Sequence, residues 1–156
     1  MKENISDQNL IKHSLAVEVI MLSLARRFGE DIEKWGLTGL LHDIDYEKVK
    51  DDLSQHSLEG AKMLEELGLG KDICQAVKVH NEAHGIPPET LMEKTLFVTD
   101  PLTGLIVAAT LVLPSKKIAD LTAENILNRF KEKAFARGAS REIIAKSEEL
   151  LNIKLE

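Results

Sequence analysis

Leu40-Leu41-His42-Asp43 is an apolar run that ends in an adjacent imidazole and carboxylate. The preceding residues predict a helix over about 31–43, and on a helix neighbouring side chains point about 100° apart. One metal ion over that edge could be reached by both His42 and Asp43 if other elements supplied further ligands. Taken alone, the dipeptide favours a buried histidine paired with its neighbour. The case for a metal therefore rests on the other histidines.

Helical periodicity continues on both sides of this stretch. The pattern predicts helices over about 6–28, 31–43, 56–68, 71–81, 89–113, 122–135 and 140–151. Asp7 can cap the start of the first helix and Gly29 its end. Gly36 and Gly39 could allow close approach of a neighbouring helix or of a ligand. Asp100-Pro101 is expected to interrupt the long apolar helix, and 44–55 to cross the surface.

Alternating β-branched runs are nearly absent, so we expect an all-α fold, a single helical bundle of the whole chain, 1–156. Its core would occupy about 6–114, followed by C-terminal helices over about 115–156. A chain of 156 residues is long enough to bury a substantial core.

The charge balance and the cysteine count indicate which binding partners and which cellular compartment to expect. With 20 basic and 26 acidic side chains, the formal net charge is -6, which argues against broad electrostatic binding to nucleic acid. A single cysteine excludes an intrachain disulfide and suits a reducing compartment. The first residues lack the apolar core of a signal peptide, and the run Leu102 to Leu113 is too short to span a bilayer. We expect a cytoplasmic protein with no membrane partner.

Each of the five histidines falls on a predicted apolar face or at a helix end: His13, His42, His56, His80 and His84. His80 and His84 are four residues apart, so both imidazoles could face one ion if the helix continues that far. Asp100 lies inside an apolar run and needs a cation, a donor or a metal. Imidazole and carboxylate without thiolate favour Fe, Mn, Co or Ni, while zinc stays open.

The order His13, His42-Asp43 and Asp100 resembles the HD superfamily of metal-dependent phosphohydrolases, over about the first 115 residues. The segment 55–61 is similar to the part that supplies an extra imidazole in HD proteins with two metals. The segment 80–87 resembles a stretch of the HD-GYP cyclic dinucleotide phosphodiesterases. Asn81 departs from that pattern and the Gly-Tyr-Pro signature is missing, so cyclic di-GMP hydrolysis is not expected. The overall likeness is to small stand-alone bacterial HD hydrolases and to HD-type dinucleoside tetraphosphate hydrolases with a two-metal centre.

The resemblance implies one or two divalent transition-metal ions. His13, His42, Asp43 and Asp100 would bind the first, and Asp43 would bridge to a second held by His56, His80 and His84. Asp43 or Asp100, the two candidate catalytic residues, would orient the nucleophile. Asp45 could be an outer partner of the site, a proton carrier or an exposed loop carboxylate. The candidate phosphate contacts are basic residues of the C-terminal third: Lys116, Lys117, Arg137 and Arg141.

The function implied is a phosphohydrolase that cleaves a nucleotide or related phosphate ester with metal-activated water. Whether it acts on monoesters, diesters or pyrophosphates stays open, as does homo-oligomerisation. One alternative is a non-catalytic nucleotide-sensing module that binds metal and ligand. Another is a structural helical protein whose histidines are incidental.

Overall fold

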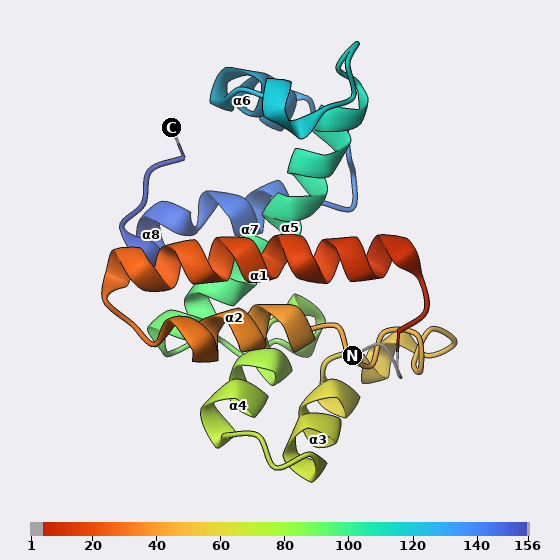
Figure 1. The fold of residues 1–156 in the computed structure, drawn as a ribbon, viewed down its shortest axis with the longest axis vertical. Coiled ribbons are helices and arrows are strands. Elements are labelled where there is room, and N and C mark those ends of the chain that lie inside the picture. The colour runs from red at the N-terminus through yellow and green to blue at the C-terminus, as the bar shows by residue number, and fades with distance from the viewer. Residues whose placement is uncertain (1–4, 156) are drawn as a thin grey trace. The chain divides into compact units, whose positions relative to one another are not determined.

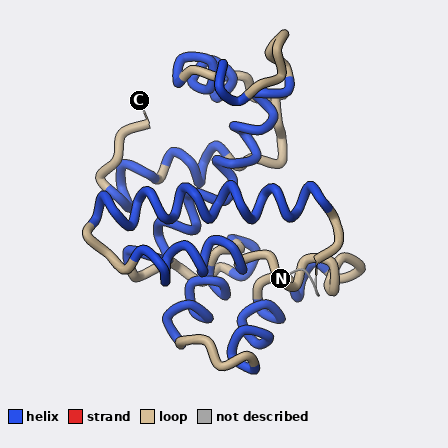
Figure 2. The backbone as a smooth tube through the Cα atoms, viewed as in Figure 1, coloured by secondary structure: helices blue, strands red, loops and turns tan. Residues whose placement is uncertain are grey.

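The computed structural model describes residues 5–155. Within this range the chain forms helices, turns and loops, with no strand (Figure 2). The prediction of an all-α fold is confirmed.

The chain divides into two compact units, one reaching to Phe97 and the other beginning at Val98. The first unit holds the helices α1 (Gln8–Phe28), α2 (Ile32–Leu41), α3 (Leu58–Glu66) and α4 (Lys71–Val79), labelled in Figure 1. Two short 3-10 helices, η1 (Leu53–Gln55) and η2 (Glu82–His84), lie in its loops. The long helix α5 (Leu91–Leu111) begins in this unit.

The ends of α1 follow the sequence prediction. The Asp7 side chain accepts a hydrogen bond from the Asn9 N–H, and Gly29 adopts a left-handed conformation with φ of 74°. That conformation favours glycine, which has no Cβ to clash. The boundaries of the first helix were therefore readable from its capping residues.

Helices α1 and α2 lie side by side (Figure 1) because two glycines of α2 face α1. A Cβ on Gly39 would lie 3.1 Å from the Glu18 backbone and 2.9 Å from Met21 Cγ. A Cβ on Gly36 would overlap the Leu22 side chain. The glycines thus serve the close approach of a neighbouring helix, the first of the two uses expected from the sequence.

Two apolar clusters fill the first unit. One joins α1, α2, α4 and the start of α5 through Val17, Met21, Ala25, Trp35, Ala76, Met92 and Leu96. The other joins α2, α3 and α4 through Leu41, Ile44, Leu64, Ile73 and Val77. Buried apolar area of this kind is the main stabilising term for a helix pair. The His42-Asp43 pair follows directly on Leu41, the last residue of α2 and a member of the second cluster.

The second unit holds the rest of α5 and the helices α6 (Ala123–Lys131), α7 (Arg141–Ala145) and α8 (Ser147–Leu151), with η3 (Ile118–Asp120) between α5 and α6. Thr122 caps α6, as its predicted start implied. Leu105, Ala139 and Ile144 form a buried cluster in this unit.

Three sequence predictions about the elements need correction. Helix α5 is continuous, with Pro101 inside it, because a proline removes only one helical N–H while its neighbours keep theirs. The segment 140–151 forms two helices, since the Lys146 N–H bonds Ile143, three residues back, and tightens the turn. The loop after Asp43 does not simply cross the surface, because Ile44, Asp45 and Val49 are buried.

Helix α5 is longer than the apolar run seen in the sequence. At 21 residues, with a mean hydropathy of 1.2 over its most apolar window, it is long and apolar enough to cross a membrane. Core helices pass the same test, and 44% of this window is buried in the structure. Length and composition alone are therefore a weak indication of a span.

The α1–α2 contact gives a testable prediction. Gly39→Ala places a methyl group against the Glu18 backbone, and overpacking of this kind costs about 1–3 kcal/mol. Gly104→Ala on α5 is the matched control, because its nearest neighbour is Ala139 Cβ at 3.8 Å. Chemical denaturation should show Gly39→Ala clearly less stable than Gly104→Ala. Equal stability of the two variants would contradict the close helix approach.

Candidate metal centre

Four imidazoles of the first unit converge on the Asp43 carboxylate. His13 comes from the second turn of α1, His42 and Asp43 from the end of α2, and His56 from just before α3. His80 comes from the end of α4. His42 is fully buried, and His80 and Asp43 are 4% and 6% exposed. Residues that are far apart in the sequence thus form one buried polar cluster.

The two carboxylate oxygens of Asp43 face different pairs of histidines. Asp43 Oδ2 lies 3.5 Å from His13 Nε2 and 3.4 Å from His42 Nε2. Asp43 Oδ1 lies 3.3 Å from His56 Nε2 and 3.6 Å from His80 Nε2. Asp43 therefore stands between two ligand groups, His13 with His42 and His56 with His80, and offers one oxygen to each.

Hydrogen bonds to backbone carbonyls orient the His42 and His80 rings and determine which ring nitrogen carries the proton. His42 Nδ1 donates to the Gly39 carbonyl at 2.8 Å, and His80 Nδ1 donates to the Val77 carbonyl at 2.6 Å. A carbonyl oxygen only accepts, so each Nδ1 carries the proton and each neutral ring keeps its lone pair on Nε2. The last carbonyls of a helix lack helical donors, which is why a histidine at the end of α2 or α4 can bond them.

Asp45 holds His56 in place. It is fully buried, and its Oδ1 accepts from His56 Nδ1 at 3.0 Å. Its Oδ2 accepts from the Ser57 and Gly60 backbone N–H groups, both at 2.8 Å, at the start of α3. Of the readings left open for Asp45, the exposed loop carboxylate is excluded.

Tyr46 was missed by sequence reasoning. Its ring packs edge-on against His56, with centroids 5.2 Å apart, and it is 40% exposed. It is the only tyrosine of the chain and lies three residues after Asp43. That proximity to the His-Asp pair was the one available signal.

Of the other predicted site residues, His84 belongs to the first unit and the rest to the second. His84 Nε2 donates to the His56 carbonyl at 2.6 Å, so that nitrogen has no lone pair to offer. It is not in the potential ligand groups found among residues 5–155. Asp100 belongs to the second unit, as do Lys116, Lys117, Arg137 and Arg141, and their functional roles stay predictions.

The contacts of Arg141 are with its own unit. Its Nη atoms donate to the backbone carbonyls of Phe135, Ala136 and Ala139 at 2.6–2.7 Å. These bonds close the loop that joins α6 to α7. Lys116, Lys117 and Arg137 are exposed.

The donor set fits a divalent transition metal. The ligand atoms of His13, His42 and Asp43 lie within 4.8 Å of one another, as do those of Asp43, His56 and His80. Imidazole nitrogens with a carboxylate suit Fe, Mn, Co, Ni or Zn. A carbonyl or carboxylate on the second ring nitrogen, as in His42, His80 and His56, is the usual support for a metal-bound histidine.

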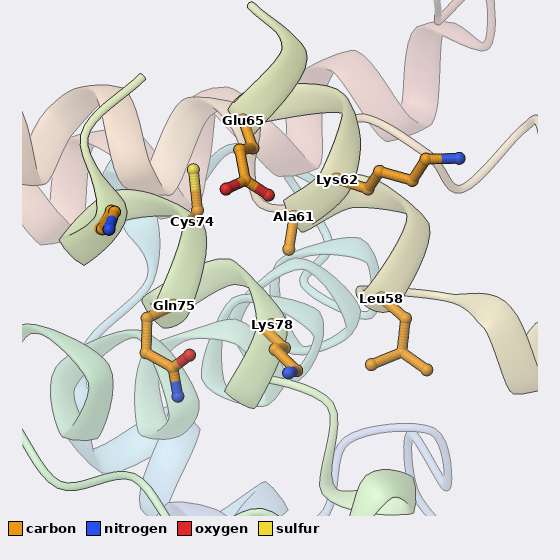
Figure 3. A pocket seen from close by; sticks show the side chains of 8 residues that line it. Leu58, Ala61, Lys62, Glu65, Cys74, Gln75 and Lys78 are labelled. Carbon is orange, nitrogen blue, oxygen red and sulfur yellow. The ribbon is translucent and has the colours of Figure 1, made fainter. Parts of the chain in front are cut away.

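A cavity of about 510 Å³ lies between α3 and α4 but is not lined by this cluster. Figure 3 shows Lys62, Glu65, Cys74 and Lys78 around it. Lys78 and His80 are two residues apart, which places them about 200° apart on a helix. The cavity and His80 therefore lie on opposite faces of α4.

A family model described as the HD domain matches residues 10–105. The chain belongs to the HD domain family. The matched range includes His13, the His42-Asp43 pair that the family name describes, and Asp100. The resemblance inferred from the order of these residues is confirmed.

Curated relatives of this HD protein carry the name Ribonuclease Y. The chain is 35% identical to the protein of Nitratidesulfovibrio vulgaris over 141 residues, and 32% identical to that of Lawsonia intracellularis over 139 residues. Both alignments cover 87% of this chain and 26% of the relative. The HD protein thus spans about a quarter of the length of these relatives. No solved structure matches it significantly.

Burial, neighbouring charges and hydrogen bonds shift the pKa values of Asp43 and His56. Burial opposes ionisation of Asp43, but the charge of His42 and hydrogen bonds with His56 and His80 outweigh it and hold the Asp43 pKa well below its usual value. Burial also opposes the charge on His56, yet its hydrogen bonds with Asp43 and Asp45 raise its pKa from 6.5 to about 9. Without metal, His56 is therefore a cation between two carboxylates at neutral pH.

This shift predicts how the stability of the metal-free protein depends on pH. A histidine whose pKa rises on folding stabilises the fold most below its unfolded pKa. The contribution of His56 to the free energy of unfolding is therefore fully present below pH 6.5 and is lost as pH rises through about 9. Thermal unfolding in a chelator should show the midpoint falling across this window, and falling less in His56→Gln. The same slope in both proteins would contradict the shift.

Proposed function

We propose that the chain is a metal-dependent phosphohydrolase that cleaves a nucleotide or related phosphate ester with metal-activated water. The observation that carries the proposal is the division of the Asp43 oxygens between two pairs of imidazoles in an HD domain. Two adjoining ligand groups with a shared carboxylate favour two ions rather than one. Bound there, the metal would supply Lewis acidity and lower the pKa of water.

The residues of the chain have separate tasks in this proposal. Asp43 bridges the two ligand groups and orients the attacking water. His13 and His42 hold one side and His56 and His80 the other, while Asp45 fixes His56 through its Nδ1 proton. Asp100 completes the first group, as the order of residues in the family implies. His84 supports the His56 backbone instead of ligating.

Phosphate contacts are proposed for the exposed cations Lys116, Lys117 and Arg137. Cations neutralise charge that develops on phosphoryl oxygens, and a guanidinium can do so with two parallel hydrogen bonds. Arg141 is the least suited of the four predicted contacts, because its donors already bond backbone carbonyls.

The substrate class is proposed as a small phosphorylated molecule, with a nucleotide first. A net charge of -6 disfavours long polyanions. The relatives named Ribonuclease Y favour a second candidate, a phosphodiester bond in RNA. We also propose a cytoplasmic location without a membrane partner, on the composition and the single cysteine.

The direct test is turnover by the purified protein loaded in turn with Mn, Fe, Co and Ni. The panel holds nucleoside monophosphates, dinucleoside polyphosphates, a cyclic nucleotide, a short RNA and an aryl phosphate. We expect hydrolysis of at least one phosphate ester and about 10–100-fold less activity in Asp45→Asn, since outer partners of metal ligands have effects of that size. Circular dichroism checks that this variant is folded.

The same panel separates the alternatives. A non-catalytic nucleotide sensor predicts thermal stabilisation by a nucleotide without any product. A structural protein predicts no bound metal and no stabilisation. Either result with a folded, metal-treated protein contradicts the hydrolase.

A second prediction concerns the number of ions. His56→Ala removes a ligand from one group only, so elemental analysis should show bound metal falling from two ions to one. His84→Ala is the matched control, because His84 Nε2 bonds a carbonyl and should leave the count unchanged. Unchanged metal content in His56→Ala would remove His56 from the centre.

A further inference from the structure

The histidines of the metal centre are held by different contacts. His42 and His80 lie at helix ends and are 0% and 4% exposed, and each ring bonds a carbonyl of the helix that it ends. His56 lies in the loop between η1 and α3, where its backbone is extended with ψ of 139°. Its side chain is 12% exposed. The His56 ring therefore lacks the support of a helix end and depends on side chains around it.

Three side chains restrict the His56 ring. The Asp45 carboxylate accepts its Nδ1 proton at 3.0 Å. The rings of His80 and Tyr46 both meet it edge-on, with centroids 5.1 and 5.2 Å away and an angle of 81° between the planes. Asp45 and His80 are buried, whereas Tyr46 is 40% exposed. One hydrogen bond alone would let the ring tilt about the donor–acceptor line, and the two neighbouring rings oppose that tilt.

The backbone that carries Tyr46 is fixed, although the side chain is exposed. Ile44 and Val49, on either side of it, are buried. The next residue, Glu47, accepts hydrogen bonds from the Ser6 N–H at 2.7 Å and from the Ser6 hydroxyl at 2.9 Å, just before α1. The loop is thus tied both to the core and to the start of a helix. Because its backbone is held in this way, the Tyr46 ring keeps its place beside His56.

The orientation of the His56 ring decides whether its second nitrogen can act as a ligand. His56 Nε2 lies 3.3 Å from Asp43 Oδ1, the oxygen that also faces His80. An imidazole offers its lone pair in the plane of the ring, so a tilt of the ring turns the lone pair away from the ligand group. Groups that orient a metal ligand typically change metal affinity about 10- to 100-fold.

We propose that Tyr46 is a positioning residue of the metal centre, whose ring holds His56 with Nε2 facing the ligand group of Asp43 and His80. It thereby sets the affinity for the ion bound by that group and leaves the group of His13 and His42 unchanged. Tyr46 binds no ion itself, because the ring and not the hydroxyl has this effect. The inference rests on the two-ion centre of the proposed function.

Titration of the metal-free full-length chain with Co²⁺, in the absence of substrate, tests the inference. Elemental analysis counts the bound ions, and the Co²⁺ absorption bands give the two affinities. Tyr46→Ala should weaken one ion about 10-fold and leave the other unchanged. Tyr46→Phe keeps the ring and should match the parent for both ions. Leu53→Ala is the matched control, since it removes an apolar side chain of the same loop that is 51% exposed, and should alter neither affinity.

A double variant shows whether Tyr46 acts through His56. His56→Ala should leave one ion, bound by the group of His13 and His42. Adding Tyr46→Ala to His56→Ala should not change the affinity for that ion, because the residue through which Tyr46 acts is gone. Circular dichroism checks the fold of each variant. If Tyr46→Ala does not fold, Tyr46→Leu takes its place, since it keeps apolar bulk without the flat ring and should also weaken one ion only.

Four results contradict the inference. Tyr46→Ala could leave both affinities unchanged, or it could weaken both ions equally, as a general loss of structure would. Tyr46→Phe could fail to match the parent, which would assign the effect to the hydroxyl. A parent chain that binds fewer than two ions would reject the two-ion centre together with the role of Tyr46. Two bound ions without turnover would reject only the hydrolase, and the two affinities would still decide the role of Tyr46.

Discussion

The first unit depends on one buried carboxylate surrounded by imidazoles. Burying an isolated carboxylate is costly, and Asp43 is 6% exposed. Its two oxygens meet histidines from α1, the end of α2, the start of α3 and the end of α4. The helices that carry these side chains must therefore approach one another closely, and the two apolar clusters hold them there.

Asp45 links that carboxylate to the backbone. One of its oxygens orients His56, and the other accepts two N–H groups at the start of α3, where a negative charge is also favoured by the helix dipole. Ser57, which supplies one of these N–H groups, adopts a left-handed φ of 71° and donates its hydroxyl proton to the Lys78 carbonyl in α4. The position of His56 is thus fixed by three elements, which explains how a loop residue can be as well placed as one on a helix.

The sequence predicted the parts of this arrangement that have local causes. Capping residues located α1, periodicity located α3 and α4, and the order of histidines and aspartates identified the HD domain. What it could not predict depends on tertiary packing. Asp45 is buried by residues distant in the sequence. The bond of His84 to the His56 carbonyl and the edge-on contact of Tyr46 with His56 also join residues whose spacing carries no helical or strand pattern. Helix α5 likewise continues through Pro101 because the helical hydrogen bonds of the neighbouring turns remain, which the proline alone does not reveal.

Gly39 contacts both α1 and the His42 ring, so it links the packing of two helices to the placement of candidate metal ligands. Its missing side chain lets α1 approach α2, and its carbonyl orients the His42 ring. His13 is carried by α1, and its Nε2 lies 3.1 Å from His42 Nε2. The interhelical spacing at this glycine therefore sets the separation of two donor nitrogens, and with it the ionic radius that the pair can accommodate. Discrimination between ions of different size would then be governed by a residue that coordinates none of them.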